Sequence, residues 1–134
     1  MSAMSDFLEA ALLNQLFRGT AYTAPGTGYV GLYTAVPNDT GGGTEVTGGG
    51  YARAPVTCNG TSWTAPGAAG TIGNANILVL GTATADWGTV VGAGYWNAVT
   101  AGTMLMWGTL TATKIVASAD VFQFDAGALG ISFA

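Results

Sequence analysis

The stretch between Asp86 and Lys114 contains no Asp, Glu, Lys or Arg, and its pattern predicts two β-strands. Glycines and threonines interrupt the stretch throughout. Because these residues are poor helix formers, we do not expect a membrane helix, which needs roughly 20 successive apolar residues. The pattern instead predicts a hairpin with strands at about Thr89–Ala98 and Thr103–Leu110. Both faces of the second strand are apolar, so we expect a domain core on one side and a second layer or a neighbouring subunit on the other.

One segment near the N-terminus, residues 5–18, has the pattern of a helix. Ser5 is a favourable N-cap and Gly19 a favourable C-terminal stop. The leucines recur every four residues and predict one apolar stripe: Leu8, Leu12 and Leu16. A helix this short is marginal alone. The stripe therefore packs on its own domain or docks on another subunit, and the pattern leaves both open.

The rest of the chain, residues 20–134, reads as short apolar runs separated by turn residues. Besides the hairpin, the predicted strands include Tyr29–Thr34, Tyr51–Thr57, Asn76–Leu80, Val121–Phe124 and Leu129–Phe133. Pro55 places its strand at a sheet edge or a bulge. We predict a mainly β protein, an antiparallel β-sandwich or jelly roll of about eight strands, preceded by an N-terminal helical arm at residues 1–19.

Residues 37–50 contain two triple-glycine runs and predict a long mobile loop that becomes ordered on assembly. This loop carries Asp39 and Glu45. The two carboxylates are far short of the six to eight ligands that calcium requires, so we expect no metal. We also expect their change to alanine to cost little stability.

Composition narrows the possible partners. Hydrophobic residues make up 49% of the chain and charged residues only 7%, with a net charge of −4. Such a surface is either covered with uncharged polar residues or partly hidden in an assembly, and both are expected here. Three basic residues cannot form the patch that nucleic acids or anionic membranes need, so neither is an expected partner. The N-terminus does not resemble a secretory signal, which predicts synthesis in a cytoplasm.

The residue types for common enzyme chemistry are missing. The chain has no histidine and a single cysteine, Cys58, so serine triads, zinc sites and cysteine–histidine dyads are excluded. The carboxylates fall in a helix start or in turns, where they serve the backbone. We expect no enzyme activity, no catalytic residues and no cofactor. Trp96 and Trp107 belong to a set of aromatic residues that serves either as core or interface anchors or as a sugar-stacking platform.

Several short motifs resemble those of a known family. They are Gly19–Tyr22, Val30–Thr34, Thr44–Val46, Gly50–Arg53, Thr84–Val90 and Ala126–Ile131. In these the chain resembles small structural proteins of tailed bacteriophages, whose members include tail-fibre-like, minor capsid and capsid cement proteins. It is similar in particular to the capsid cement proteins of freshwater cyanophages, which form trimers on the outside of the head.

The resemblance implies a structural virion protein without catalytic residues. We expect a cement protein, made in the host cytoplasm, that binds the outer surface of the major capsid protein shell as a homotrimer. The alternative is a tail-fibre or baseplate module that binds a carbohydrate receptor. The residues that we expect to contact partners are Leu8, Leu12, Leu16, Asp39, Glu45, Trp96 and Trp107.

Overall fold

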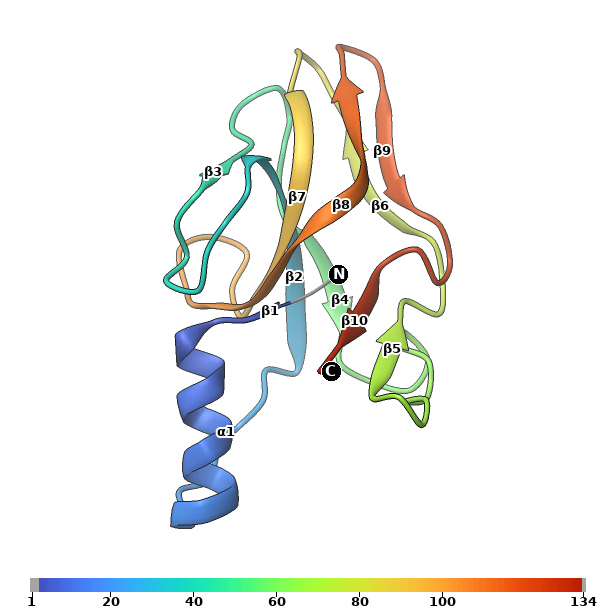
Figure 1. Ribbon diagram of the computed structural model, residues 1–134. Coiled ribbons are helices and arrows are strands. Elements are labelled where there is room, and N and C mark those ends of the chain that lie inside the picture. The colour runs from blue at the N-terminus through green and yellow to red at the C-terminus, as the bar shows by residue number, and fades with distance from the viewer. Residues whose placement is uncertain (1–2, 134) are drawn as a thin grey trace.

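Strand β2 is an interior strand of the main sheet because both of its edges are paired. The computed structural model describes residues 3–133, and there the sheet has the order β1-β8-β7-β2-β3, with β4 also on β2 (Figure 1). The strands are β1 (Ala3–Met4), β2 (Thr27–Ala35), β3 (Thr44–Glu45), β4 (Ala54–Thr57), β7 (Gly88–Trp96) and β8 (Met104–Val116). One edge of β2 pairs with β7, and β4 and β3 share the other edge.

Two further strand pairs complete the sandwich. Strand β6 (Leu78–Thr82) pairs with β9 (Val121–Phe124), and β5 (Thr71–Gly73) pairs with β10 (Gly130–Ser132). Every pairing is antiparallel. The predicted fold class, a mainly antiparallel β-sandwich with one short helix, is confirmed.

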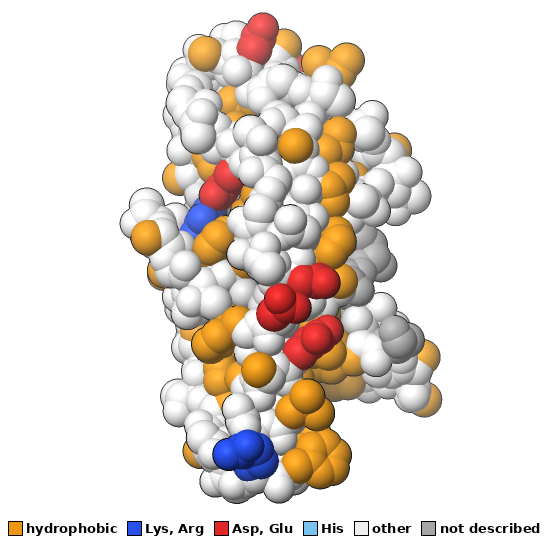
Figure 2. Space-filling view, turned by 60° about the vertical axis from the view of Figure 1, so that its left-hand side comes forward, with side chains coloured by type: hydrophobic (Ala, Val, Ile, Leu, Met, Phe, Trp, Pro, Cys, Tyr) orange, Lys and Arg blue, Asp and Glu red, His pale blue; other side chains and the backbone are white. Residues whose placement is uncertain are grey.

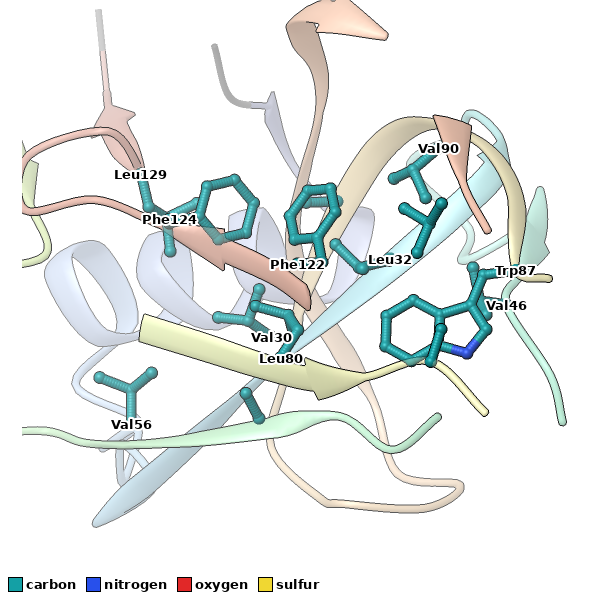
Figure 3. Close-up of a cluster of buried hydrophobic side chains, with 14 of the residues drawn as sticks. Val30, Leu32, Val46, Val56, Leu80, Trp87, Val90, Phe122, Phe124 and Leu129 are labelled. Carbon is teal, nitrogen blue, oxygen red and sulfur yellow. The ribbon is translucent and has the colours of Figure 1, made fainter. Parts of the chain in front are cut away.

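The main core lies between the central sheet and the β6–β9 pair (Figure 3). Val30 and Leu32 of β2 point to this side, since successive residues of a strand face opposite sides of the sheet. Phe122 and Phe124 of β9 meet them, with the two phenyl rings 5.3 Å apart in an edge-to-face arrangement. The alternation of apolar residues that predicts the strands therefore also supplies the side chains of the core.

The predicted hairpin forms, but its second strand is longer than expected. Strand β8 continues to Val116 and passes through Lys114. The register with β7 shifts between Val90 and Gly92, which marks a bulge within this pairing. The two-residue strands β1 and β3 were not predicted, because a segment this short has no detectable periodicity.

One buried polar side chain joins the lower part of the sandwich to β9. The amide nitrogen of Asn74 donates to the carbonyls of Asn76 at 2.7 Å and Asp125 at 2.9 Å, and its oxygen accepts from the amide of Leu129 at 2.9 Å. Within residues 3–133, no buried side-chain nitrogen or oxygen lacks a hydrogen-bond partner. Burial of polar groups is therefore compensated throughout this part of the chain.

Helix α1 (Asp6–Arg18) begins and ends where the sequence predicts. Ser5 is the N-cap, and its hydroxyl oxygen accepts from the amide of Leu8. Gly19 ends the helix in the left-handed conformation, which glycine adopts without strain. The helix runs away from the sandwich and its C-terminal end is the far tip (Figure 1). No helix among residues 3–133 has the length and hydrophobicity to cross a membrane.

Replacing Ser5 with alanine is expected to lower the free energy of unfolding by about 1–2 kcal/mol. Ser5 is buried, and besides capping the helix its hydroxyl donates to the carbonyl of Met104 at 2.7 Å. The change leaves that carbonyl and one helix amide without partners. Urea unfolding followed by tryptophan fluorescence measures the effect. Serine-to-alanine at the exposed Ser118 is the control, and an equal loss there would contradict the capping role.

Candidate interaction surfaces

One side of α1 packs against its own domain. Leu8 is buried with Leu105 and Met106 of β8, and Leu12 packs on the edge of this small cluster. Strand β1 adds a second connection, because Ala3 and Met4 pair with β8 just before the helix starts. The N-terminal segment is therefore fastened to the main sheet at its base. Residues 1, 2 and 134 of the predicted ranges lie outside the described part of the chain.

The part of α1 that its own domain leaves uncovered is apolar and exposed. Leu13, Leu16 and Phe17 have 58%, 73% and 78% of their surface accessible. Of the stripe predicted from Leu8, Leu12 and Leu16, the domain buries Leu8 and covers part of Leu12, whereas Leu16 stays exposed. A spacing of four residues turns by about 40° at each step, so Leu16 lies about 80° from Leu8 around the helix.

Charge is distributed unequally along this helix. Asp6 and Glu9 occupy the first turn and Arg18 the last. Figure 2 shows acidic side chains near the helix base, a basic group at the far end and hydrophobic side chains between them. Each sign also suits the helix dipole at its own end. Helix α1 therefore has an acidic base, an exposed apolar surface in its C-terminal half and a basic residue at its tip.

A groove of about 550 Å³ separates the tip half of α1 from the rest of the domain. Leu12 and Gln15 of the helix line one wall, and Ile131 and Phe133 near the C-terminus line another. The groove is lined mostly by apolar side chains, so the underside of the helix is only partly covered by its own domain.

The outer face of the main sheet carries a network centred on Arg53. Its guanidinium makes two parallel hydrogen bonds of 2.8 Å to the carboxylate of Glu45. It also donates to the carbonyls of Ala98 and Ala101, both at 2.9 Å, and lies 3.8 Å from the ring centre of Trp96. One buried side chain thus connects β3, β7 and the β7–β8 turn.

The hydroxyl of Tyr51 extends this network to the edge of β2. It donates to Glu45 at 2.8 Å and accepts from the amide of Leu32 at 2.8 Å. Gly31 leaves the space, because a Cβ there would lie 2.8 Å from a Glu45 carboxylate oxygen and 3.0 Å from the Tyr51 hydroxyl. A glycine in the middle of β2 therefore makes room for the charged pair.

The phenols of the network remain protonated at neutral pH. Burial is the main cause that raises the pKa of Tyr33 from 10.0 to about 12, with the Glu45 carboxylate contributing. Burial also raises the pKa of Tyr51. A phenol whose pKa is raised by folding stabilises the fold below pH 10, and this contribution is lost as the pH rises through about 12. Both phenols therefore keep their protons, and the Tyr51 hydroxyl can donate to Glu45.

Asp39 lies at the helix base. Its carboxylate accepts from the indole nitrogen of Trp107 at 2.9 Å, and its backbone carbonyl accepts from the amide of Asp6 at 3.0 Å. The indole nitrogen of Trp96 donates to Tyr33 at 3.1 Å. Both predicted tryptophans therefore use their polar atom inside the domain.

The structure corrects the prediction for residues 37–50. This segment packs on the sheet: β3 pairs with β2, and Val46 is buried in the core. Asp39 and Glu45 bind different partners, so they do not form a shared site. Because Glu45 neutralises the buried Arg53, the structure reverses the expectation that its loss costs little stability.

Sequence reasoning missed Arg53, Tyr51 and Tyr33 as members of this network. One signal was present, since Tyr51 and Arg53 are two residues apart and follow the loop that carries Glu45. In an extended segment such a pair points to one side. Their meeting with Glu45 over Gly31, however, depends on strand pairing that the sequence pattern does not give.

The chain matches the family described as podophage GP4 fiber I protein gp80 over residues 3–132, and it belongs to this family. The predicted relationship to structural proteins of tailed phages is confirmed, and the family is one of fibre proteins rather than enzymes. The family description names a fibre and not a capsid cement protein. No curated protein matches the chain.

Proposed function

We propose that this protein is a structural subunit of a fibre on the virion of a tailed phage, and that it holds other subunits in place. The family match over nearly the whole chain supports a fibre in preference to the capsid cement role expected from sequence. In this proposal the sandwich is a rigid body, and the contacts are made by surfaces that its fold leaves apolar and exposed.

The outer side of α1 is the observation that carries this proposal. Its base is fixed by β1 and by Ser5, whereas Leu13, Leu16 and Phe17 are exposed at its free end. Exposed apolar patches on a soluble domain mark interaction sites. A helix held at one end and apolar at the other suits a connecting element between subunits.

Two other roles remain as alternatives. Low charge favours a cement protein that binds the major capsid protein as a homotrimer, because much of such a surface is hidden in the shell. A carbohydrate-binding module needs free aromatic faces for stacking. Trp63 and Trp87 are buried and Trp96 lies against Arg53, which supports a building role for these rings instead.

Copy number and position in the virion test the proposal. Quantitative mass spectrometry of purified particles, with the major capsid protein as the internal standard, is expected to give tens of copies. Gold-labelled antibodies are expected to mark an appendage. Hundreds of copies with label over the head surface would instead assign the protein to capsid cement.

A further inference from the structure

Helix α1 is apolar on two opposite sides, and its own domain covers only one of them. Leu8 faces β8, whereas Leu13 and Phe17 lie on the far side of the helix. Phe7 is not part of the uncovered stripe, because its ring packs edge-to-face on Tyr22 at 6.2 Å. Exposed apolar patches on a folded domain mark interaction sites. The outer stripe is therefore a candidate contact surface.

The charges on the helix indicate which partner fits. The acidic pair Asp6 and Glu9 lies at the base, and Arg18 lies at the tip, about 18 Å from Asp6 and about 14 Å from Glu9 along the helix axis. A second copy of the same helix, turned end for end, would place its basic tip beside the acidic base. In this register Leu13 lies near the middle of the contact and Phe17 lies against the partner's first turn, and the two helix dipoles are antiparallel.

We propose that the outer face of α1 binds α1 of a second copy of this chain in an antiparallel, two-fold arrangement. Such a contact is self-complementary, since each charged end meets its opposite on the partner. Asp39 lies beside the helix base through its hydrogen bond to Asp6 and adds a third carboxylate near the incoming Arg18. The pairing does not rest on the fibre assignment.

Parallel helices, as around a three-fold axis, would bring the acidic bases of all copies together and leave the arginines together at the tips. Like charges side by side are unfavourable, although modestly so at an exposed site. The charge pattern of α1 thus favours the antiparallel pair for this contact. A trimer, if it forms, would need a different surface.

The contact is small, which sets the concentration at which it can be tested. One helix of 13 residues covers less than a standard protein interface, so we expect a dissociation constant in the micromolar range. Sedimentation equilibrium of the purified full chain at about 100 μM is therefore suitable. The expected species has twice the 13.4 kDa mass of the monomer.

Charge reversal distinguishes the antiparallel pair from other contacts. Arg18→Glu is expected to weaken the dimer about tenfold, because both ends then bring like charges together. Adding Asp6→Lys and Glu9→Lys to that variant restores opposite charges at both ends and should return the affinity to within about threefold of the wild type. Lys114→Glu, at an exposed cation on β8, is the control and should leave the dimer unchanged.

The contribution of the exposed apolar residues of α1 is tested separately. Leu13→Gln together with Phe17→Gln should weaken the dimer by about 100-fold, because the stripe is the part that loses contact with water. Ile115→Gln changes a side chain that is 74% exposed on β8 and serves as the matched control. Circular dichroism checks that each variant keeps its helix.

Two results would overturn the proposal. One is a monomer at about 100 μM, which would assign the stripe to a different protein. The other is an oligomer of any size whose stability does not change with Arg18→Glu, as a parallel arrangement predicts. Either result leaves the copy-number test of the fibre assignment unaffected, so failure of one proposal can be told from failure of the other.

Discussion

Alanine in place of Arg53 is expected to lower the free energy of unfolding by about 3 kcal/mol. The loss of Arg53 leaves the charge of its partner in this partly buried ion pair without compensation. Glu45 would keep its charge beside the sheet with only the Tyr51 hydroxyl to bind it. The carbonyls of Ala98 and Ala101 would also lose their donor. Urea denaturation followed by tryptophan fluorescence measures the change.

Two further variants serve as controls for the Arg53→Ala measurement. Lys114→Ala removes an exposed cation and is expected to cost less than about 0.5 kcal/mol. Arg53→Lys keeps the charge but cannot bind the carboxylate with two parallel hydrogen bonds, so it should be intermediate. A loss below about 1 kcal/mol for Arg53→Ala would show that the network contributes little to the stability of the fold.

Replacing Trp87 with alanine is expected to destabilise the protein by about 3–5 kcal/mol, the range for removing a large aromatic side chain from a core. Trp87 is buried in the main cluster, and Tyr51 packs edge-to-face on it at 5.4 Å. Its indole nitrogen also donates to the carbonyl of Gly49 at 2.9 Å. Thermal and urea unfolding should both report the loss.

Trp107 supplies a matched comparison for that experiment. It too donates an indole hydrogen bond at 2.9 Å, to Asp39, but it is only partly buried. Trp107→Ala should therefore cost clearly less than Trp87→Ala, by about 2 kcal/mol. Equal losses would mean that the hydrogen bond, rather than the buried ring, determines the cost at both positions.

Local signals in the sequence were sufficient for the helix and for strand β9. Ser5 and Gly19 are capping residues, and they delimit α1 as observed. Val121–Phe124 alternates between the core and the solvent, and β9 has these bounds. Each of these elements is determined within a few residues of chain, so a pattern can identify it.

The interaction surfaces depend on contacts between distant segments, which the pattern does not contain. Arg53 and Glu45 are eight residues apart but meet only because β3 and β4 share an edge of β2. The exposure of Leu16 depends on which side of the helix β8 covers. The sequence identifies an apolar helix, and only the packing determines which of its residues remain exposed.

The Tyr51 hydroxyl has a consequence for how the protein behaves when many copies accumulate in an infected cell. Leu32 lies in the gap between β4 and β3, where an unpaired backbone would invite a strand from another molecule. Tyr51 occupies its amide, and the amide of Val46 occupies its carbonyl at 2.9 Å. With charge on only 7% of its residues, the chain has little electrostatic repulsion to keep copies apart. The Tyr51 side chain covers this gap in the sheet edge, and we expect this to reduce aggregation before assembly.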